Sequence, residues 1–219
     1  MVALLISGCS SCPPKGLPAS NCLERSGEQA LAQGRPAEAR AIFFQAMRGS
    51  DQPFVAWIGV ARSSIAMQDL RTAEIALAQA MQTNPGSAAS IDLIGRTMLM
   101  LAQAMGEGGR TQALTADALF TRAERLDPEL PKLDYHRGLA HLAANDAGGA
   151  VALLERAATA DPNDENALRA LLIAYGRAGR SEQAHAWVEM LRRTNRLPPS
   201  MEGLTGTPAE SMPSREGNP

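Results

Sequence analysis

The 219-residue sequence is poor in aromatic side chains, which make up only 4% of it. It also has no run of about twenty apolar residues, the length that a membrane-spanning helix needs, so we expect no such helix. No stretch alternates β-branched and polar residues, so no strand is expected either. The net charge is −2, without the basic excess of nucleic-acid-binding proteins, and we expect no nucleic-acid partner. These absences predict an all-α chain.

Cysteine is also scarce. The three cysteines, Cys9, Cys12 and Cys22, all lie near the start of the sequence. Cys9 and Cys12 have the spacing of a zinc-ligand pair, but no second pair of ligands follows at the spacing of a zinc finger. We therefore expect no metal site.

The segment Ile6-Ser7-Gly8-Cys9 resembles the lipobox of bacterial lipoproteins. In that family a signal peptidase cuts before the cysteine, whose thiol receives a diacylglycerol. The resemblance implies lipidation of Cys9, and Ser10 in place of aspartate implies sorting to the outer membrane. Cys12 and Cys22 would then lie in an oxidising compartment, where they could form a disulfide.

The segment from Glu165 to Ala184 has the pattern of a helical hairpin. Leu168, Leu171 and Tyr175 recur at a spacing of three and four residues, which places them on one face of a helix. A break at 179–181 separates this helix from a second one. The small residues of the segment would let the two helices approach closely.

This hairpin resembles a tetratricopeptide (TPR) repeat, whose period is about 34 residues. The same pattern can be placed over most of the chain, with units that begin at Ser20, Phe54, Ala88, Pro131 and Glu165. The resemblance implies an all-α fold, a right-handed α-solenoid of about five hairpins. The expected organisation is a lipoprotein-like leader over residues 1–22, a TPR solenoid over 23–199, and a tail over 200–219 whose composition favours disorder. Alanines in the second helix of each unit would face the neighbouring helices: Ala39, Ala73, Ala116, Ala150 and Ala184.

The third unit fits the pattern only if about nine residues are inserted between its two helices. The inserted segment, Met98–Arg110, is rich in methionine and would lengthen the first helix. Two interpretations stay open. The segment could project and dock a partner, since methionine adapts to different surfaces, or it could fold back and fill the core.

In the TPR family the first helices of the repeats line a concave groove that binds peptides or partner segments. The resemblance places the following residues at exposed groove positions: Glu24, Glu28, Ile58, Arg62, Asp92, Arg96, Lys132, Tyr135, Leu139 and Arg169. Arg62 and Arg96 have the same position in successive units, so their guanidinium groups could together bind a carboxylate. Alternatively, they are ordinary solvated charges paired to Asp92.

No sequence feature indicates catalysis. The chain has no nucleophile elbow, no P-loop and no dinucleotide-binding fingerprint. His136 and His141 are five residues apart and point about 140° away from each other on a helix, which does not suit a joint metal site. We therefore expect no enzymatic activity, no catalytic residue, no cofactor and no small-molecule substrate.

The layout of lipobox and repeats resembles small bacterial TPR lipoproteins of envelope and pilus assembly. The resemblance implies a non-catalytic protein-interaction scaffold that helps assemble a pilus, secretion or outer-membrane complex. It would be lipid-anchored to the outer membrane through Cys9, facing the periplasm, with protein or peptide segments bound in its groove. The alternatives are a soluble cytoplasmic TPR adaptor, whose start only mimics a lipobox, and an accessory subunit of an enzyme.

Overall fold

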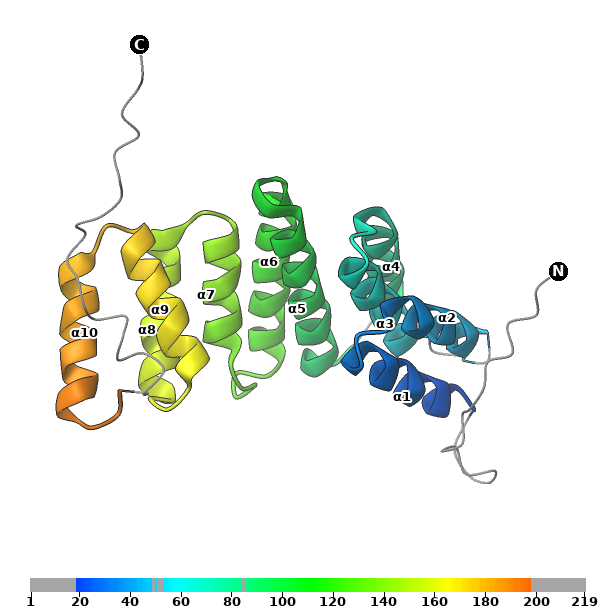
Figure 1. Ribbon diagram of the computed structural model, residues 1–219, viewed down its shortest axis with the longest axis horizontal. Coiled ribbons are helices and arrows are strands. Elements are labelled where there is room, and N and C mark those ends of the chain that lie inside the picture. Colours follow the sequence, from blue (N-terminus) through cyan, green and yellow to red (C-terminus); the bar gives the residue numbers. More distant parts are fainter. Residues whose placement is uncertain (1–18, 49, 51–52, 84–85, 198–219) are drawn as a thin grey trace, which may run out of the picture. The chain divides into compact units, whose positions relative to one another are not determined.

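The computed structural model describes residues 19–48, 50, 53–83 and 86–197. Throughout these residues the regular structure is helical and no strand occurs (Figure 1). The elements are α1 (Ala19–Ala32), α2 (Pro36–Met47), α3 (Phe54–Ala66), α4 (Leu70–Gln82), α5 (Ala88–Met105), the 3₁₀-helix η1 (Gly106–Gly109), α6 (Arg110–Leu126), α7 (Leu133–Ala143), α8 (Ala147–Ala160), α9 (Glu165–Arg177) and α10 (Ser181–Arg193). The predicted all-α class is confirmed.

The turns that follow α1, α3, α5, α7 and α9 share one backbone feature, a residue with positive φ. These residues are Gly34, Gln68, Gly106, Asn145 and Gly179, with φ between 59° and 70°. A left-handed residue ends a helix and reverses the chain direction within a short turn. After two of these turns an aspartate caps the next helix: Asp69 accepts a hydrogen bond from the Thr72 amide, and Asp146 accepts one from the Gly149 amide. Short turns of this kind set the geometry of the hairpins α1–α2, α3–α4 and α5–α6 in the first part of the chain and of α9–α10 near its end.

Glycines make room for the large side chains of the core. Phe43 of α2 is fully buried, and a methyl group added at Gly27 or Gly59 would lie 2.7 Å or 2.4 Å from its ring. Phe120 of α6 packs in the same way on Gly95 of α5, where an added methyl group would lie 2.6 Å from the ring. Each ring therefore fills a space that only a residue without a side chain leaves open.

The alanines that the repeat pattern assigns to helix contacts are buried, with one exception. Ala39, Ala73, Ala116 and Ala150 are 0% exposed. Ala184 is only half-buried. It lies on α10, the last helix in the part of the chain that the structure describes, so no later helix of that part covers it.

The chain divides into two compact units between Asn145 and Asp146. The first contains α1–α7, and one apolar core runs through it from Ala30 to Ala140. The second contains α8–α10, in which α8 packs against α9 and α9 against α10.

The predicted division into leader, solenoid and tail stays a prediction. The first helix begins at Ala19, within the range that the sequence assigns to the leader. Cys9 and the tail residues 200–219 lie outside the described residues. Cys22 is disulfide-bonded, but Cys12 also lies outside the described residues, so the Cys12–Cys22 pairing remains a hypothesis.

The inserted residues lengthen both helices of the third hairpin. α5 has 18 residues and α6 has 17, whereas the other α-helices have 11–14. Among the large apolar side chains of the insert, Leu99 and Leu101 are 4% and 0% exposed, and Met100, at 42%, is well exposed. Gln103, residues 106–108 and Arg110 are exposed as well. Ala102 and Ala113 pack together with residues at the end of α7. The apolar side chains of the insert therefore lie mainly in the core, in line with the second of the two interpretations, while its polar residues and its tip are exposed.

Candidate protein-binding surface

The first helices of the repeats form one layer in the first unit. α1 packs against α3, α3 against α5, and α5 against α7. This layer contains the groove positions that the repeat pattern assigns within the unit. Several of its charged side chains bind one another, within a helix or across two helices.

An ion pair joins α1 to α3. Nη1 of Arg62 lies 2.7 Å from both carboxylate oxygens of Glu28. Both side chains are partly exposed, at 33% and 42%. Glu28 and Arg62 are 34 residues apart, so they have the same position in adjacent repeats. The pair therefore links neighbouring hairpins at the surface of the layer.

A second, more buried cluster joins α5 to α7. Asp92 is only 7% exposed. Its Oδ2 accepts a hydrogen bond from Nε of Arg96 at 2.8 Å, and its Oδ1 lies 3.0 Å from Nδ1 of His136. The His136 ring stacks at 5.4 Å from the Phe120 ring, with an interplanar angle of 31°. A carboxylate accepts at both oxygens, so Asp92 holds Arg96 and His136 at once and is not free to take a ligand group.

Several predicted groove residues differ from expectation. Ile58 is 2% exposed and belongs to the apolar core, so its predicted exposure is wrong. Asp92 is likewise buried rather than exposed. Arg62 and Arg96 do not form a pair of free cations, since each is bound by a carboxylate of this chain. For Arg96 that carboxylate is Asp92, as the alternative interpretation stated.

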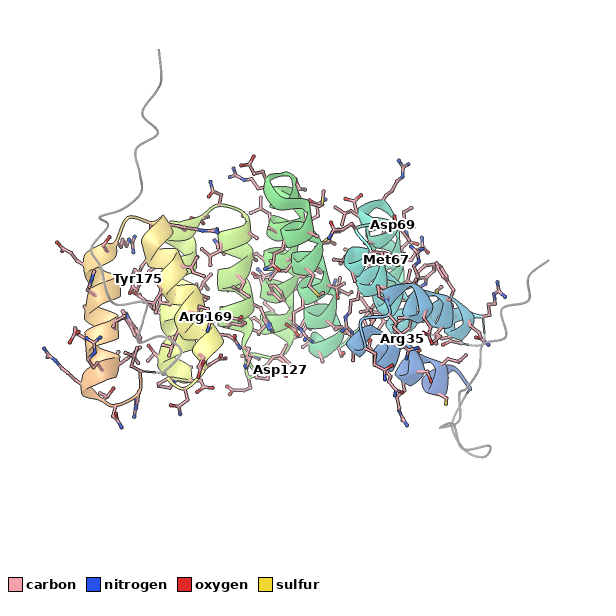
Figure 2. All side chains as sticks on the ribbon, viewed as in Figure 1. Arg35, Met67, Asp69, Asp127, Arg169 and Tyr175 are labelled. Atoms are coloured by element: carbon pink, nitrogen blue, oxygen red, sulfur yellow. The ribbon has the colours of Figure 1, made fainter. Side chains whose placement is uncertain are left out.

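The remaining predicted positions are accessible. Arg96 keeps 47% of its side chain exposed despite its ion pair. Lys132 is exposed, while Tyr135 and Leu139 are half-buried. Arg169 is exposed on α9 in the second unit (Figure 2). That these residues bind a partner stays a prediction.

A polar cluster between α6 and α7 was not expected from the sequence. Arg137 donates from Nε to Asp117 at 2.9 Å and from Nη1 to Glu124 at 3.0 Å. Nε2 of His141 lies 3.7 Å from the same oxygen of Asp117. The cluster fixes α7 on the long helix α6. It is a structural contact, and its distances along the sequence follow no repeat period that could have revealed it.

Asp69 is a further polar link. It accepts a hydrogen bond from Nη1 of Arg40 at 2.7 Å, in addition to the bond from Thr72 that caps α4. The hydrogen bonds from Thr72 first, and the nearby Arg40 guanidinium second, hold the pKa of the Asp69 carboxyl below its usual value. The turn between α3 and α4 is thereby tied to α2.

In the second unit Tyr175 is 1% exposed and donates its hydroxyl hydrogen bond to Glu155 of α8. Burial, followed by the interaction with Glu155, raises the pKa of Tyr175. Tyr175 therefore stays neutral and connects α9 to α8. Ile173, on the same helix as Arg169, is 45% exposed, which gives this unit an accessible apolar position.

Among the described residues, no group of His, Cys, Asp and Glu could hold a metal ion. Within the same residues, no helix is long and apolar enough to cross a membrane.

The comparisons with known proteins concern the repeats. Residues 141–205 match the family described as tetratricopeptide repeat. A comparison with curated proteins gives no match. The structure is similar to that of a thermophilic TPR protein of Thermus thermophilus, with a TM-score of 0.60 and 23% identity over 81% of this chain and 92% of that one.

Two further solved structures are similar. PilW, described as a widely conserved type IV pilus biogenesis factor, has a TM-score of 0.68 and 19% identity, over 87% of this chain and 84% of that one. YrrB, described as a TPR protein with an unusual peptide-binding site, has a TM-score of 0.56 and 15% identity, over 84% and 90%. At these identities the likeness is one of fold. The predicted tetratricopeptide fold, of the all-α solenoid class, is confirmed.

Proposed function

We propose that this chain is a non-catalytic protein-interaction scaffold. The observation that carries the proposal is the layer of packed first helices in the first unit, in which Arg96 and Lys132 are exposed and Tyr135 is half-buried. Because its inner charges are already paired, a partner would meet a preorganised surface and would not have to order it. A peptide or protein segment is the class of partner that fits such an extended surface.

The finer proposal is a lipid-anchored envelope protein that assists the assembly of a pilus, secretion or outer-membrane complex. The lipobox-like segment ending at Cys9 and the likeness of fold to a type IV pilus biogenesis factor support it. The disulfide at Cys22 also fits an oxidising compartment, where disulfides persist. The chain would face the periplasm from the outer membrane.

The anchoring is tested by fractionating cells that express the full chain or a Cys9→Ser variant. One acyl chain gives marginal binding and two or more hold a protein firmly on a bilayer, so the intact chain should sediment with membranes and the Cys9→Ser variant should be released. A Cys12→Ser variant is the matched control and should stay with the membranes. Membrane retention of the Cys9→Ser variant would rule out the lipid anchor.

The scaffold role is tested by placing a photo-crosslinking amino acid at Arg96 and, as control, at Gln82, which is exposed on α4. Irradiation of cells should give a discrete crosslinked adduct from position 96 and none from position 82. Identification of the adduct by mass spectrometry names the partner. Equal labelling from both positions, or none from position 96, would contradict binding at this surface.

A further inference from the structure

An apolar pocket lies on the first unit at the contact of α2 with α3. It has a volume of about 620 Å³ and is lined by Ala41, Phe44, Met47, Arg48 and Trp57. Met47 and Trp57 pack with one side against the apolar core and leave the other side accessible. The pocket is shallow and open rather than enclosed. None of the lining residues belongs to the groove positions described above.

Phe44 is exposed because its neighbour Phe43 takes the buried position on α2. Phe43 is fully buried between Gly27 and Gly59, and successive residues of a helix point about 100° apart. Phe44 therefore cannot join that core, and it is 42% exposed. Together with Trp57 and Met47 it forms a contiguous apolar surface rather than a single exposed side chain, and such surfaces mark interaction sites.

Arg48 gives the pocket its charge. It is the single charged residue among those that line the pocket. Its side chain makes no ion pair or hydrogen bond with the described residues, unlike Arg62 and Arg96, which are both bound by carboxylates. A guanidinium at the edge of an apolar pocket can bind a carboxylate with two hydrogen bonds. The charge of the pocket is thus complementary to an anion.

We propose that this pocket is a second docking site, distinct from the surface of the first helices. Its occupant is a segment of a partner protein that inserts one large apolar side chain between Phe44 and Trp57 and places an adjacent carboxylate against Arg48. A second copy of this chain fits less well. A two-fold interface brings the same patch of both copies together, so two Arg48 side chains would enter an apolar interface whose lining offers no carboxylate.

The proposal is tested by selecting a library of random displayed peptides on the immobilised full chain. Peptides in which a large apolar residue stands next to Asp or Glu should be enriched. A fluorescent version of an enriched peptide is then titrated against the unaltered chain and against two variants of the pocket, Phe44→Ser and Arg48→Glu. Each variant should bind the peptide about tenfold or more weakly, as expected for the loss of an apolar anchor or a charge partner. Added salt should weaken binding to the unaltered chain. In a Trp187→Phe background Trp57 is the single tryptophan, and its emission should change when the peptide binds.

Two matched variants control for general effects. Ile75→Ser removes a comparably exposed apolar side chain from α4, and Arg71→Glu reverses a charge on the exposed face of the same helix. Neither should alter peptide binding, and all four variants should keep the helical circular dichroism spectrum and the melting temperature.

Enrichment of basic peptides, no enrichment, or binding that survives Phe44→Ser would overturn the proposal. Self-association that Phe44→Ser abolishes would assign the pocket to a second copy instead. Loss of binding only in Arg96→Glu would place the peptide on the first helices, which leaves the proposed scaffold function intact and overturns the second site.

Discussion

At the scale of single residues, the turns carry backbone strain that can be measured. Gln68 has a φ of 59° at the turn position where the first and last hairpins have Gly34 and Gly179. A left-handed conformation costs an L-residue about 1–2 kcal/mol, and glycine avoids that cost. Gly34 has no heavy atom near its hypothetical side chain, so any effect of substitution there comes from the backbone alone.

We predict that Gln68→Gly stabilises the protein by about 0.5–1 kcal/mol. The substitution removes the backbone strain of the left-handed residue, and the greater conformational entropy of glycine in the unfolded chain offsets part of that gain. Gly34→Ala should destabilise it by about 1 kcal/mol for the opposite reason. Urea unfolding of both variants measures these changes. A lower stability of Gln68→Gly would mean that the side chain makes contacts that outweigh its backbone strain.

Tyr175 gives the second prediction at this scale. Because the pKa of Tyr175 is raised in the folded protein by burial and by Glu155, its contribution to stability is complete below the ordinary tyrosine pKa of about 10. It is lost as the pH rises towards the folded-state value, since the unfolded tyrosine releases its proton first. The protein should therefore lose stability at alkaline pH.

The variant Tyr175→Phe should be less stable than the parent by about 1 kcal/mol at neutral pH, where it leaves Glu155 without its hydrogen bond. This difference should shrink above about pH 10, because phenylalanine cannot ionise. Urea unfolding of both proteins at neutral and alkaline pH measures it. A difference that stays constant with pH would show that the hydroxyl ionises equally in both states.

At the scale of elements, the long hairpin of α5 and α6 depends on a close approach at its tip. A methyl group added at Gly109 would lie 2.1 Å from the backbone oxygen of Ala102, whereas one added at Gly108 would meet nothing within 4 Å. Backbone atoms cannot move aside as a flexible side chain can. The two adjacent glycines therefore differ in what a substitution would do.

We predict that Gly109→Ala destabilises the protein by about 1–3 kcal/mol, the usual cost of overpacking, and that Gly108→Ala changes it by less than about 0.5 kcal/mol. Chemical denaturation of the two variants tests whether the insert is core. Equal, small effects would show that the tip of the hairpin is loosely packed and free to dock a partner.

At the scale of the whole molecule, each unit is stabilised by the packing of its helices on their neighbours, because a single helical hairpin cannot bury its apolar face alone. The contribution of helix packing to stability can be tested within the second unit alone. Leu154 of α8 and Leu171 of α9 are 0% and 1% exposed. Ile173, two residues from Leu171, is 45% exposed and is a matched control.

Leu154→Ala or Leu171→Ala should each cost about 2–5 kcal/mol and should lower the protection of amide hydrogens across α8, α9 and α10 together, as expected for a cooperative unit. Ile173→Ala should have little effect. Hydrogen exchange followed by mass spectrometry resolves the helices. Protection lost in one helix alone would contradict cooperative unfolding of the unit.

The repeat phase could be predicted from the sequence because it depends on residue size at fixed spacings. Gly27, Gly95, Ala39 and Ala73 are small at positions where helices approach, and the structure buries each of them. The period of hydrophobic residues fixes which face of each helix turns inward. The existence of the hairpins and most of their core were therefore accessible from the sequence.

The pairing of charges on the candidate surface was decided by the tertiary structure. Repeat positions place Glu28, Arg62 and Arg96 in one row, but they do not determine which carboxylate each arginine takes. Arg62 binds Glu28 across one repeat, while Asp92 binds Arg96 within its own helix and His136 on α7. The choice depends on side-chain reach and on the position of neighbouring helices. The sequence by itself thus determined the periodic scaffold, because local spacing encodes helix faces, and only the packed helices decided which polar groups are satisfied and which, such as Arg48, remain available.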